Sequence, residues 1–148
     1  MIELIMTIVI GGILSIIVGP IFVQGINSYF QSQKITDVGA QGKLAMERMV
    51  REIRNIDNPA TDISTMTAGQ LTFTLNGTSI SYTLSGNQLS RNSDPLASNV
   101  SSLTFFYYKK DWTTTTTDKT LVWRIRIQFL FQSSLQTFQT SVFLRNAA

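Results

Sequence analysis

The sequence predicts an α+β protein in which one long N-terminal helix packs on an antiparallel β-sheet. Residues 4–23 carry no charge, residues 38–56 repeat apolar side chains at three- and four-residue steps, and the period changes to two after Pro59. We expect residues 1–57 to form the helix. Residues 58–148 should form a globular β-sheet domain that packs on helix residues 38–56.

The first half of the predicted helix has the length of a membrane span. The uncharged residues 4–23 would form a helix of roughly 30 Å, the thickness of the hydrocarbon core of a bilayer. We therefore expect residues 1–25 to be a transmembrane helix. No Lys or Arg precedes this stretch, whereas five follow it between residues 34 and 54. The positive-inside rule alone would thus place the globular part in the cytoplasm.

The second half of the helix is predicted to be amphipathic. Apolar residues of one face form a stripe that should be buried: Val38, Ala45, Met49, Ile53 and Ile56. The opposite face carries i,i+4 pairs of opposite charge, Arg48/Glu52 among them, which suit a solvated surface. Asn58-Pro59 should end the helix, because proline disfavours helical geometry in the residue before it.

About four to six β-strands are expected after Pro59. Residues 70–75 and 78–84 alternate and are joined by Asn76-Gly77, a strong hairpin signal. Further strands are expected around Leu89 and over residues 103–109, 121–132 and 135–145, with a solvated loop at residues 113–117 and a turn at residues 133–134. In the clearest strand one face is apolar: Leu121, Trp123, Ile125, Ile127, Phe129 and Phe131.

The composition gives little support to catalysis or metal binding. The 148 residues carry a formal charge of +3, only 14% are charged, and neither histidine nor cysteine is present. Disulfides, thiol chemistry and histidine–zinc sites are therefore excluded. The acids beyond the helix are isolated: Asp57, Asp62, Asp94, Asp111 and Asp118. General acid–base catalysis needs paired groups, so we expect no enzyme, cofactor or metal site.

The N-terminal residues Ile2-Glu3-Leu4-Ile5-Met6, followed by an apolar helix, resemble the signal region of type IV pilins and type II secretion pseudopilins. In that family a prepilin peptidase cuts after a glycine. Glu3 and Pro20 each stand two places earlier than in the family pattern, so we expect residues to be missing before Met1. The segments KLAMERMVREI, GQLTFTLNG, SSLTFFYY and TSVFLRN are similar to the minor pilins and J-type pseudopilins.

The resemblance implies a pilin-like fold and a structural role. The chain would be a subunit of a type IV pilus or type II secretion-like pseudopilus, most similar to a minor or priming subunit. Its partners would be other pilin or pseudopilin subunits, an inner-membrane assembly platform protein, the prepilin peptidase and, before assembly, membrane lipid. A basic leader, usual in prepilins, would turn the globular part toward the periplasm or exterior, and assembly would carry it into an extracellular filament. Three alternatives are a major filament subunit, a DNA-binding or adhesive pilin, and a solitary membrane-anchored periplasmic domain.

Glu3 is the candidate residue for assembly. A carboxylate at the edge of the hydrocarbon is unfavourable. The resemblance implies that Glu3 neutralises the N-terminal amine of a neighbouring subunit and sets the axial register. It also implies that the peptidase is able to methylate this amine. The structural alternative is a Glu at the membrane interface, where a helix N-terminus favours negative charge.

Two groups of small or helix-breaking residues lie within the apolar helix. Gly19 and Pro20 should kink or locally melt it. They are either a tolerated kink or a segment that unwinds when subunits pack in a filament. Gly11, Gly12 and Ser15 are a weak signal for a face where neighbouring helices approach closely.

A basic and aromatic segment is the candidate ligand surface. Arg124 and Arg126, together with Lys109 and Lys110, could bind DNA beside the neighbouring tryptophans. The alternative, which we favour, is that the two arginines form the polar side of a half-buried strand.

Overall fold

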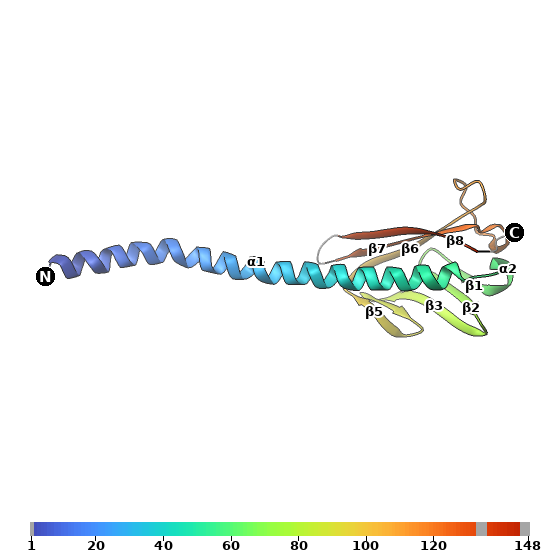
Figure 1. Ribbon diagram of the computed structural model, residues 1–148, viewed down its shortest axis with the longest axis horizontal. Coiled ribbons are helices and arrows are strands. Elements are labelled where there is room, and N and C mark those ends of the chain that lie inside the picture. The colour runs from blue at the N-terminus through green and yellow to red at the C-terminus, as the bar shows by residue number, and fades with distance from the viewer. Residues whose placement is uncertain (1, 133–135, 146–148) are drawn as a thin grey trace. The chain divides into compact units, whose positions relative to one another are not determined.

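The computed structural model describes residues 2–132 and 136–145. It confirms the predicted α+β class, with one long N-terminal helix whose later part packs on antiparallel β-strands (Figure 1). The chain divides into two compact units, Met1–Asp37 and Val38–Ala148. The described residues of the first unit are all helical, and all described strands belong to the second.

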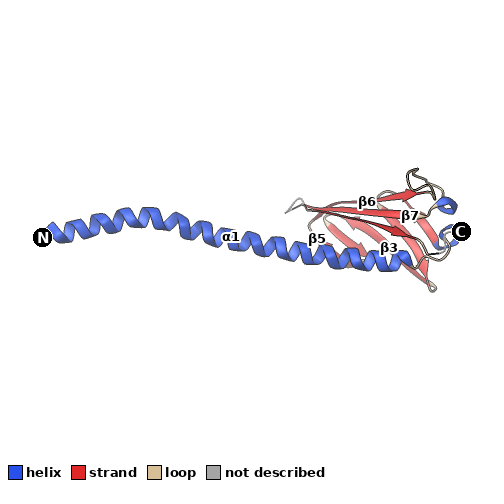
Figure 2. Ribbon diagram, turned by 45° about the horizontal axis from the view of Figure 1, so that its top comes forward, coloured by secondary structure: helices blue, strands red, loops and turns tan. Residues whose placement is uncertain are grey.

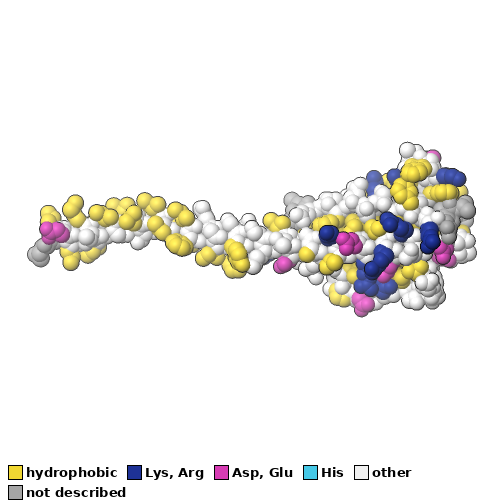
Figure 3. All heavy atoms as spheres, in the orientation of Figure 1, with side chains coloured by type: hydrophobic (Ala, Val, Ile, Leu, Met, Phe, Trp, Pro, Cys, Tyr) yellow, Lys and Arg dark blue, Asp and Glu magenta, His cyan; other side chains and the backbone are white. Residues whose placement is uncertain are grey.

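Helix α1 spans Ile2–Arg54. Each described residue of the first unit is exposed, and Figure 3 shows apolar side chains along this part of the helix. From Val38 onward one face is buried, with Gly42 in the middle of it. The predicted stripe is confirmed: Val38, Ala45, Met49, Ile53 and Ile56 are all buried.

The helix ends at Arg54, three residues before the predicted boundary. Hydrogen bonds from Asn55 N to Glu52 O and from Ile56 N to Ile53 O span three residues, so the last turn tightens. Asn58 then caps a separate short helix, α2 (Pro59–Asp62), by accepting a hydrogen bond from Ala60 N at 3.0 Å. Pro59 stands in the first turn of α2, where its missing N–H does no harm.

Eight described strands form two antiparallel sheets (Figure 2). The first sheet, in the order β1-β2-β3-β4-β5, contains β1 (Ile63–Met66), β2 (Gln70–Leu75), β3 (Thr78–Ser85), β4 (Gln88–Arg91) and β5 (Asp94–Ser98). The second, in the order β6-β7-β8, contains β6 (Val100–Tyr108), β7 (Arg124–Phe131) and β8 (Thr137–Phe143). The expectation of one sheet with four to six strands was therefore wrong.

The missed strands are short and show little alternation. β1 has four residues, and β5 begins Asp94-Pro95, a pair that sequence rules assign to turns. The change of sheet occurs at a single residue, Asn99, which lies between β5 and β6 with φ 60°. Asn tolerates this left-handed conformation better than most residues, and nothing in the strand pattern marks such a switch.

The predicted hairpin at Asn76-Gly77 is confirmed. β2 and β3 pair in register from Gln70↔Thr83 to Leu75↔Thr78. Asn76 and Gly77 both have positive φ, 51° and 77°, as the two-residue turns that match strand twist require.

The prediction for β7 was correct in its centre and wrong at its start. The inward residues are fully buried: Ile125, Ile127, Phe129 and Phe131. Leu121, however, ends a 3-10 helix, η1 (Lys119–Leu121), and Trp123 precedes the strand. The side chain of Asp118 caps η1, and this local cap stops the alternation from continuing backwards.

The C-terminal strand and the threonine-rich loop agree with expectation. β8 covers the centre of the predicted strand, with Phe138 half-buried and Val142 and Leu144 buried. Residues 113–117 are mostly exposed, and Thr115 forms an isolated bridge with Tyr108. The turn predicted at residues 133–134 lies outside the described residues. The buried stripe of α1 and the inward faces of both sheets form one hydrophobic core.

Candidate functional site

Up to Val23 the exposed surface of the first unit is almost entirely apolar, whereas residues 24–37 mix apolar and polar side chains. Nineteen large hydrophobic side chains between Ile2 and Ile35 are at least 43% exposed. Moving them out of water would stabilise the protein on the order of 30 kcal/mol, taking about 1.5 kcal/mol for each. Helix α1 is long and apolar enough to cross a membrane. This surface requires a cover of lipid or protein.

Glu3 lies in the first turn of α1 and is exposed. From Ile2 to Gln33 it is the only charged residue in the sequence. A carboxylate in this place interacts favourably with the positive end of the helix dipole. Its role in axial register concerns a neighbouring subunit and stays a prediction.

The small residues of the first unit leave open space beside the helix. A Cβ atom added at Gly11 or Gly12 would meet no other atom within 4 Å. The hydroxyl of Ser15 donates to the carbonyl oxygen of Gly11 at 2.8 Å, so its polar group is satisfied within its own helix. The surface can accept a close neighbour, and helix–helix packing there stays a prediction.

Pro20 lies inside α1, and the helix continues through Gly19 and Pro20 without interruption. The local melting expected from the sequence is thus absent from the single chain. The first part of the helix is gently curved (Figure 1). Proline has no N–H to donate to the carbonyl of Ile16, four residues earlier, so the backbone has one hydrogen bond fewer here than elsewhere in α1. Unwinding during filament assembly stays a prediction.

A partly buried ionic cluster joins α1 to the first sheet. Arg91 Nε on β4 lies 2.9 Å and 3.1 Å from the two carboxylate oxygens of Glu52. The hydroxyl of Tyr82 on β3 donates to Glu52 Oε2 at 2.6 Å, and Arg48 Nε lies 3.4 Å from Oε1. The Glu52 side chain is only 13% exposed. The prediction that Arg48/Glu52 is a solvated surface pair was therefore wrong.

The cluster keeps Glu52 ionised. Burial alone would raise the pKa of Glu52, but the hydrogen bonds from Arg91 and Tyr82 outweigh it, and the pKa is lowered. Burial and the hydrogen bond to Glu52 raise the pKa of Tyr82. The sequence could not reveal this cluster, because its strand residues are 30 and 39 positions away from Glu52.

Gly42 allows the second sheet to approach the helix. A Cβ atom at this position would lie 2.5 Å from the Phe138 ring on β8, closer than non-bonded atoms can come. The Phe138 ring stacks on Phe129 with centroids 5.4 Å apart. Gly42 is thus required by a close contact between α1 and β8.

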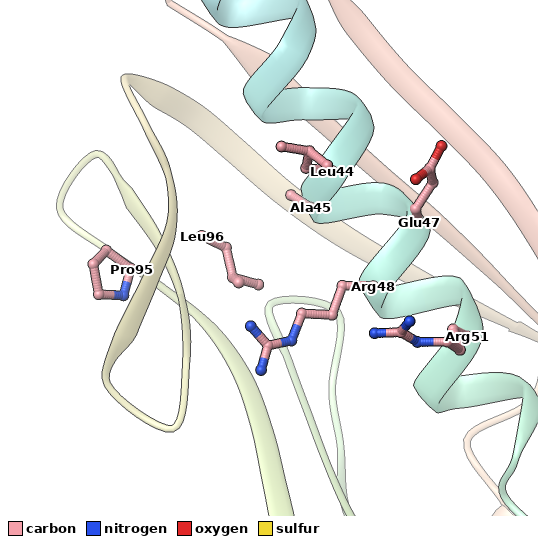
Figure 4. A pocket seen from close by; sticks show the side chains of 7 residues that line it. All are labelled: Leu44, Ala45, Glu47, Arg48, Arg51, Pro95 and Leu96. Atoms are coloured by element: carbon pink, nitrogen blue, oxygen red, sulfur yellow. The ribbon is translucent and has the colours of Figure 1, made fainter.

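Two hollows in the second unit flank α1. The first, ≈ 500 Å³, lies between the helix and β5 and has Arg48, Arg51 and Leu96 in its wall (Figure 4). The second, ≈ 590 Å³, lies beside Gly39 and Phe138. Neither wall contains a nucleophile next to a base. Among the described residues no group of three or more acidic side chains is placed to hold a metal ion.

The two arginines of the predicted ligand surface lie together on the polar face of β7, as the favoured alternative states. The Arg124 guanidinium lies 4.2 Å from the centre of the Tyr108 ring, and that of Arg126 lies 4.4 Å from the Phe106 ring. Both side chains are half-buried. Contact with an aromatic face stabilises a guanidinium.

The two lysines of that surface make contacts different from those of the two arginines. Lys110 lies over the ring of Trp123, 4.4 Å from its centre. Lys109 is half-buried at the end of β6, and its backbone N–H donates to Thr114 O at 2.9 Å. Each of Lys110, Arg124 and Arg126 thus lies over an aromatic ring of the chain itself.

Sequence reasoning missed an exposed aromatic pair beside this surface. Trp112 and Phe143 are 56% and 46% exposed, and their ring centroids are 4.8 Å apart. The alternation of the last strand places Phe143 on the opposite face from Val142, which was the available signal. Its contact with Trp112, thirty-one residues earlier, has no signature in the sequence.

Comparison of the chain with protein-family models, with curated proteins and with solved structures gives no match.

Proposed function

We propose that this protein is a structural subunit of a pilin-like filament, either a type IV pilus or a type II secretion-like pseudopilus. The observation that supports the proposal is that the two parts of α1 have different surroundings. Its residues up to Asp37 are exposed, and those up to Val23 are almost entirely apolar, whereas one face of the helix from Val38 onward is built into the core of a globular unit. A single helix therefore joins a folded domain to an apolar segment that lipid or protein has to shield from water.

The apolar segment of α1 can be shielded from water either by lipid or by the helices of neighbouring subunits. In a bilayer the segment would be buried among acyl chains. In a filament it would be buried among the same segments of neighbouring subunits, whose small residues Gly11 and Gly12 allow close approach. Because both states remove the same apolar area from water, a subunit can pass from one to the other without exposing it.

The proposed role implies a location in the cell and a set of assembly partners. The subunit would be inserted once in the inner membrane, with its globular unit on the periplasmic or outer side, and would meet a prepilin peptidase, an assembly platform protein and other pilin-like subunits. A structural rather than a catalytic role agrees with a sequence without His or Cys.

Glu3 provides the test. In the Glu3→Ala variant we expect the protein to stay in the membrane fraction and to be lost from sheared filaments, because the carboxylate that would pair with a neighbour's N-terminal amine is gone. Glu47→Ala is the matched control, since Glu47 is an exposed helix carboxylate of the second unit. Normal entry of the Glu3→Ala variant into filaments would refute the assigned role.

The same fractionation separates the related proposals. A minor or priming subunit, which the sequence similarity favours, should be scarce relative to other subunits in purified filaments. A major subunit should dominate them. A solitary membrane-anchored domain should never leave the membrane fraction, even when its sequence is intact.

A further inference from the structure

Trp112 is held in a conformation that displays its ring. Its φ of 71° lies in the left-handed region, which is unfavourable for a bulky side chain. Trp112 is 56% exposed, and its indole rests on Phe143, which is 46% exposed. A strained backbone that presents two apolar rings to solvent is unusual for a surface loop and points to a binding role.

Several contacts fix this arrangement. Arg124 Nη2 donates to the carbonyl oxygen of Trp112 at 2.6 Å, and the Trp112 N–H donates to Lys109 O at 3.0 Å. The Asp111 carboxylate accepts hydrogen bonds from the N–H groups of Thr113 and Thr114. The loop is therefore built around the tryptophan, with its acidic group turned to its own backbone.

The surroundings of the pair are basic. Residues 109–124 contain Lys109, Lys110, Lys119 and Arg124 against two acids, Asp111 and Asp118. Among the described residues none of these four basic groups forms an ion pair. Asp118 is engaged, like Asp111, with groups of its own segment, the N–H and hydroxyl of Thr120. The Lys119 ammonium is engaged, since its Nζ donates to Ser64 O at 2.7 Å. Lys109, Lys110 and Arg124 thus carry the positive charge that an anionic partner would meet.

We propose that this aromatic–basic tip, formed by Trp112, Phe143, Lys109, Lys110 and Arg124, docks on the surface of an anionic lipid bilayer. Tryptophan prefers the boundary between headgroups and acyl chains, where its ring is buried and its N–H stays hydrated. Lysine and arginine beside it attract anionic headgroups. The tip combines the two features that peripheral membrane binding requires.

A single-stranded nucleic acid fits the tip less well. Such a ligand is bound by a basic groove in which successive bases stack on successive aromatic rings. Here one exposed aromatic pair is present, and the neighbouring Tyr108 and Phe106 rings are already covered by Arg124 and Arg126. Docking of the tip on a bilayer does not require filament assembly, because all residues of the tip belong to the second unit.

The experiment uses residues 38–148, which contain every buried residue of the described chain and hence the whole core. The fragment is mixed with phosphatidylcholine vesicles, with and without phosphatidylglycerol, and floated on a density gradient. We expect it to float only with the anionic vesicles. In a Trp123→Phe background Trp112 is the remaining tryptophan, and its fluorescence should shift to the blue on binding.

Matched variants test the role of the rings and of the charge. Trp112→Ala should weaken vesicle binding at least about tenfold, the loss expected when one large apolar side chain no longer leaves water. Lys109→Glu with Lys110→Glu should abolish flotation. Leu44→Ala removes an apolar side chain on α1 that is at least as exposed as Trp112, and it should leave vesicle binding unchanged. Thermal unfolding checks that each variant is folded, and Trp112→Phe should retain most of the binding.

Three results would overturn the proposal. The first is equal flotation with neutral vesicles. The second is anionic binding that is indifferent to Trp112→Ala in a folded variant. The third is single-stranded DNA that binds the fragment while anionic vesicles do not.

Discussion

Glu52 links α1 to two strands of the first sheet. Arg91 and Tyr82 come to its carboxylate from two different strands, and Arg48 comes from the preceding turn of the helix. A partly buried carboxylate is stabilising only while its partners are in position, because a charge removed from water without them is unfavourable. The cluster therefore selects one placement of the helix on the sheet.

Replacing Glu52 by Gln should lower the free energy of unfolding by about 2 kcal/mol, because hydrogen bonds to a charged group become bonds to a neutral amide and Arg91 loses its counter-charge. Urea denaturation of the fragment of residues 38–148 measures this free energy of unfolding. Glu47→Gln, which alters an exposed pair with Lys43 at 4.0 Å, should change the value by less than about 0.5 kcal/mol. Equal effects of the two substitutions would contradict the assigned role of the cluster.

The same carboxylate predicts a dependence of stability on pH. The pKa of Glu52 is lower in the folded protein than its ordinary value of 4.5, so the folded state favours the ionised form. This contribution is complete at neutral pH and is lost as the pH falls below about 4.5 toward the lower folded pKa. Between pH 7 and pH 3 the Glu52→Gln variant should lose less stability than the natural sequence. A parallel decline of the two proteins would show that another group is responsible.

Gly42 and Gly39 lie on the same helix and should respond in opposite directions to alanine. At Gly42 the new Cβ would lie 2.5 Å from the Phe138 ring, whereas at Gly39 it would meet nothing within 4 Å. Gly39→Ala should stabilise by up to about 1 kcal/mol through helix propensity. Gly42→Ala should destabilise by about 1–3 kcal/mol, because the ring packed on Phe129 has to shift. Thermal unfolding compares the stability of each variant with that of the natural sequence. Stabilisation by Gly42→Ala would refute the close contact between Gly42 and Phe138.

At the scale of elements, α1 is one helix with two environments. Its first part has no buried residue, and the core begins at Val38. Deleting residues 1–37 should therefore leave the free energy of unfolding of the second unit unchanged within about 0.5 kcal/mol, the usual limit for changes away from packed contacts. The comparison is made with the full chain in a mild detergent. A large loss in the fragment would mean that the first part of α1 contributes to the folded core.

The elements also show which features the sequence could predict. The inward residues of β7 and the stripe of α1 were predictable, because period two and period 3.6 are properties of neighbouring residues. The split into two sheets at Asn99 was not, since pairing between strands depends on contacts distant in sequence. The burial of Glu52 was missed for the same reason. An i,i+4 partner such as Arg48 is visible in the sequence, whereas Arg91 and Tyr82 become its neighbours only in the folded unit.

The candidate functional residues also differ in whether the sequence alone can reveal them. Glu3, Gly11, Gly12 and Pro20 are found by the sequence because they stand out against an apolar background. Trp112 and Phe143 form a pair only because the loop after β6 is tied back to β7 through Arg124 and the Trp112 carbonyl. Such a pair requires the structure.

In the proposed assembly, the apolar part of α1 exchanges lipid for the helices of neighbouring subunits. The natural sequence has no cysteine, so a single introduced cysteine reports one position without background. Ile16 is suitable, since it is three-quarters exposed and lies in the middle of the apolar segment.

The most direct measurement is therefore oxidative cross-linking of the Ile16→Cys variant in its native host, followed by separation of membranes from sheared filaments. The account predicts a disulfide-linked product in the filament fraction whenever a second pilin-like subunit carries a cysteine at the matching position. The same variant with Glu3→Ala should yield only monomer in the membrane fraction. A protein that stays monomeric and membrane-bound in the natural background, while filaments form without it, would contradict the account.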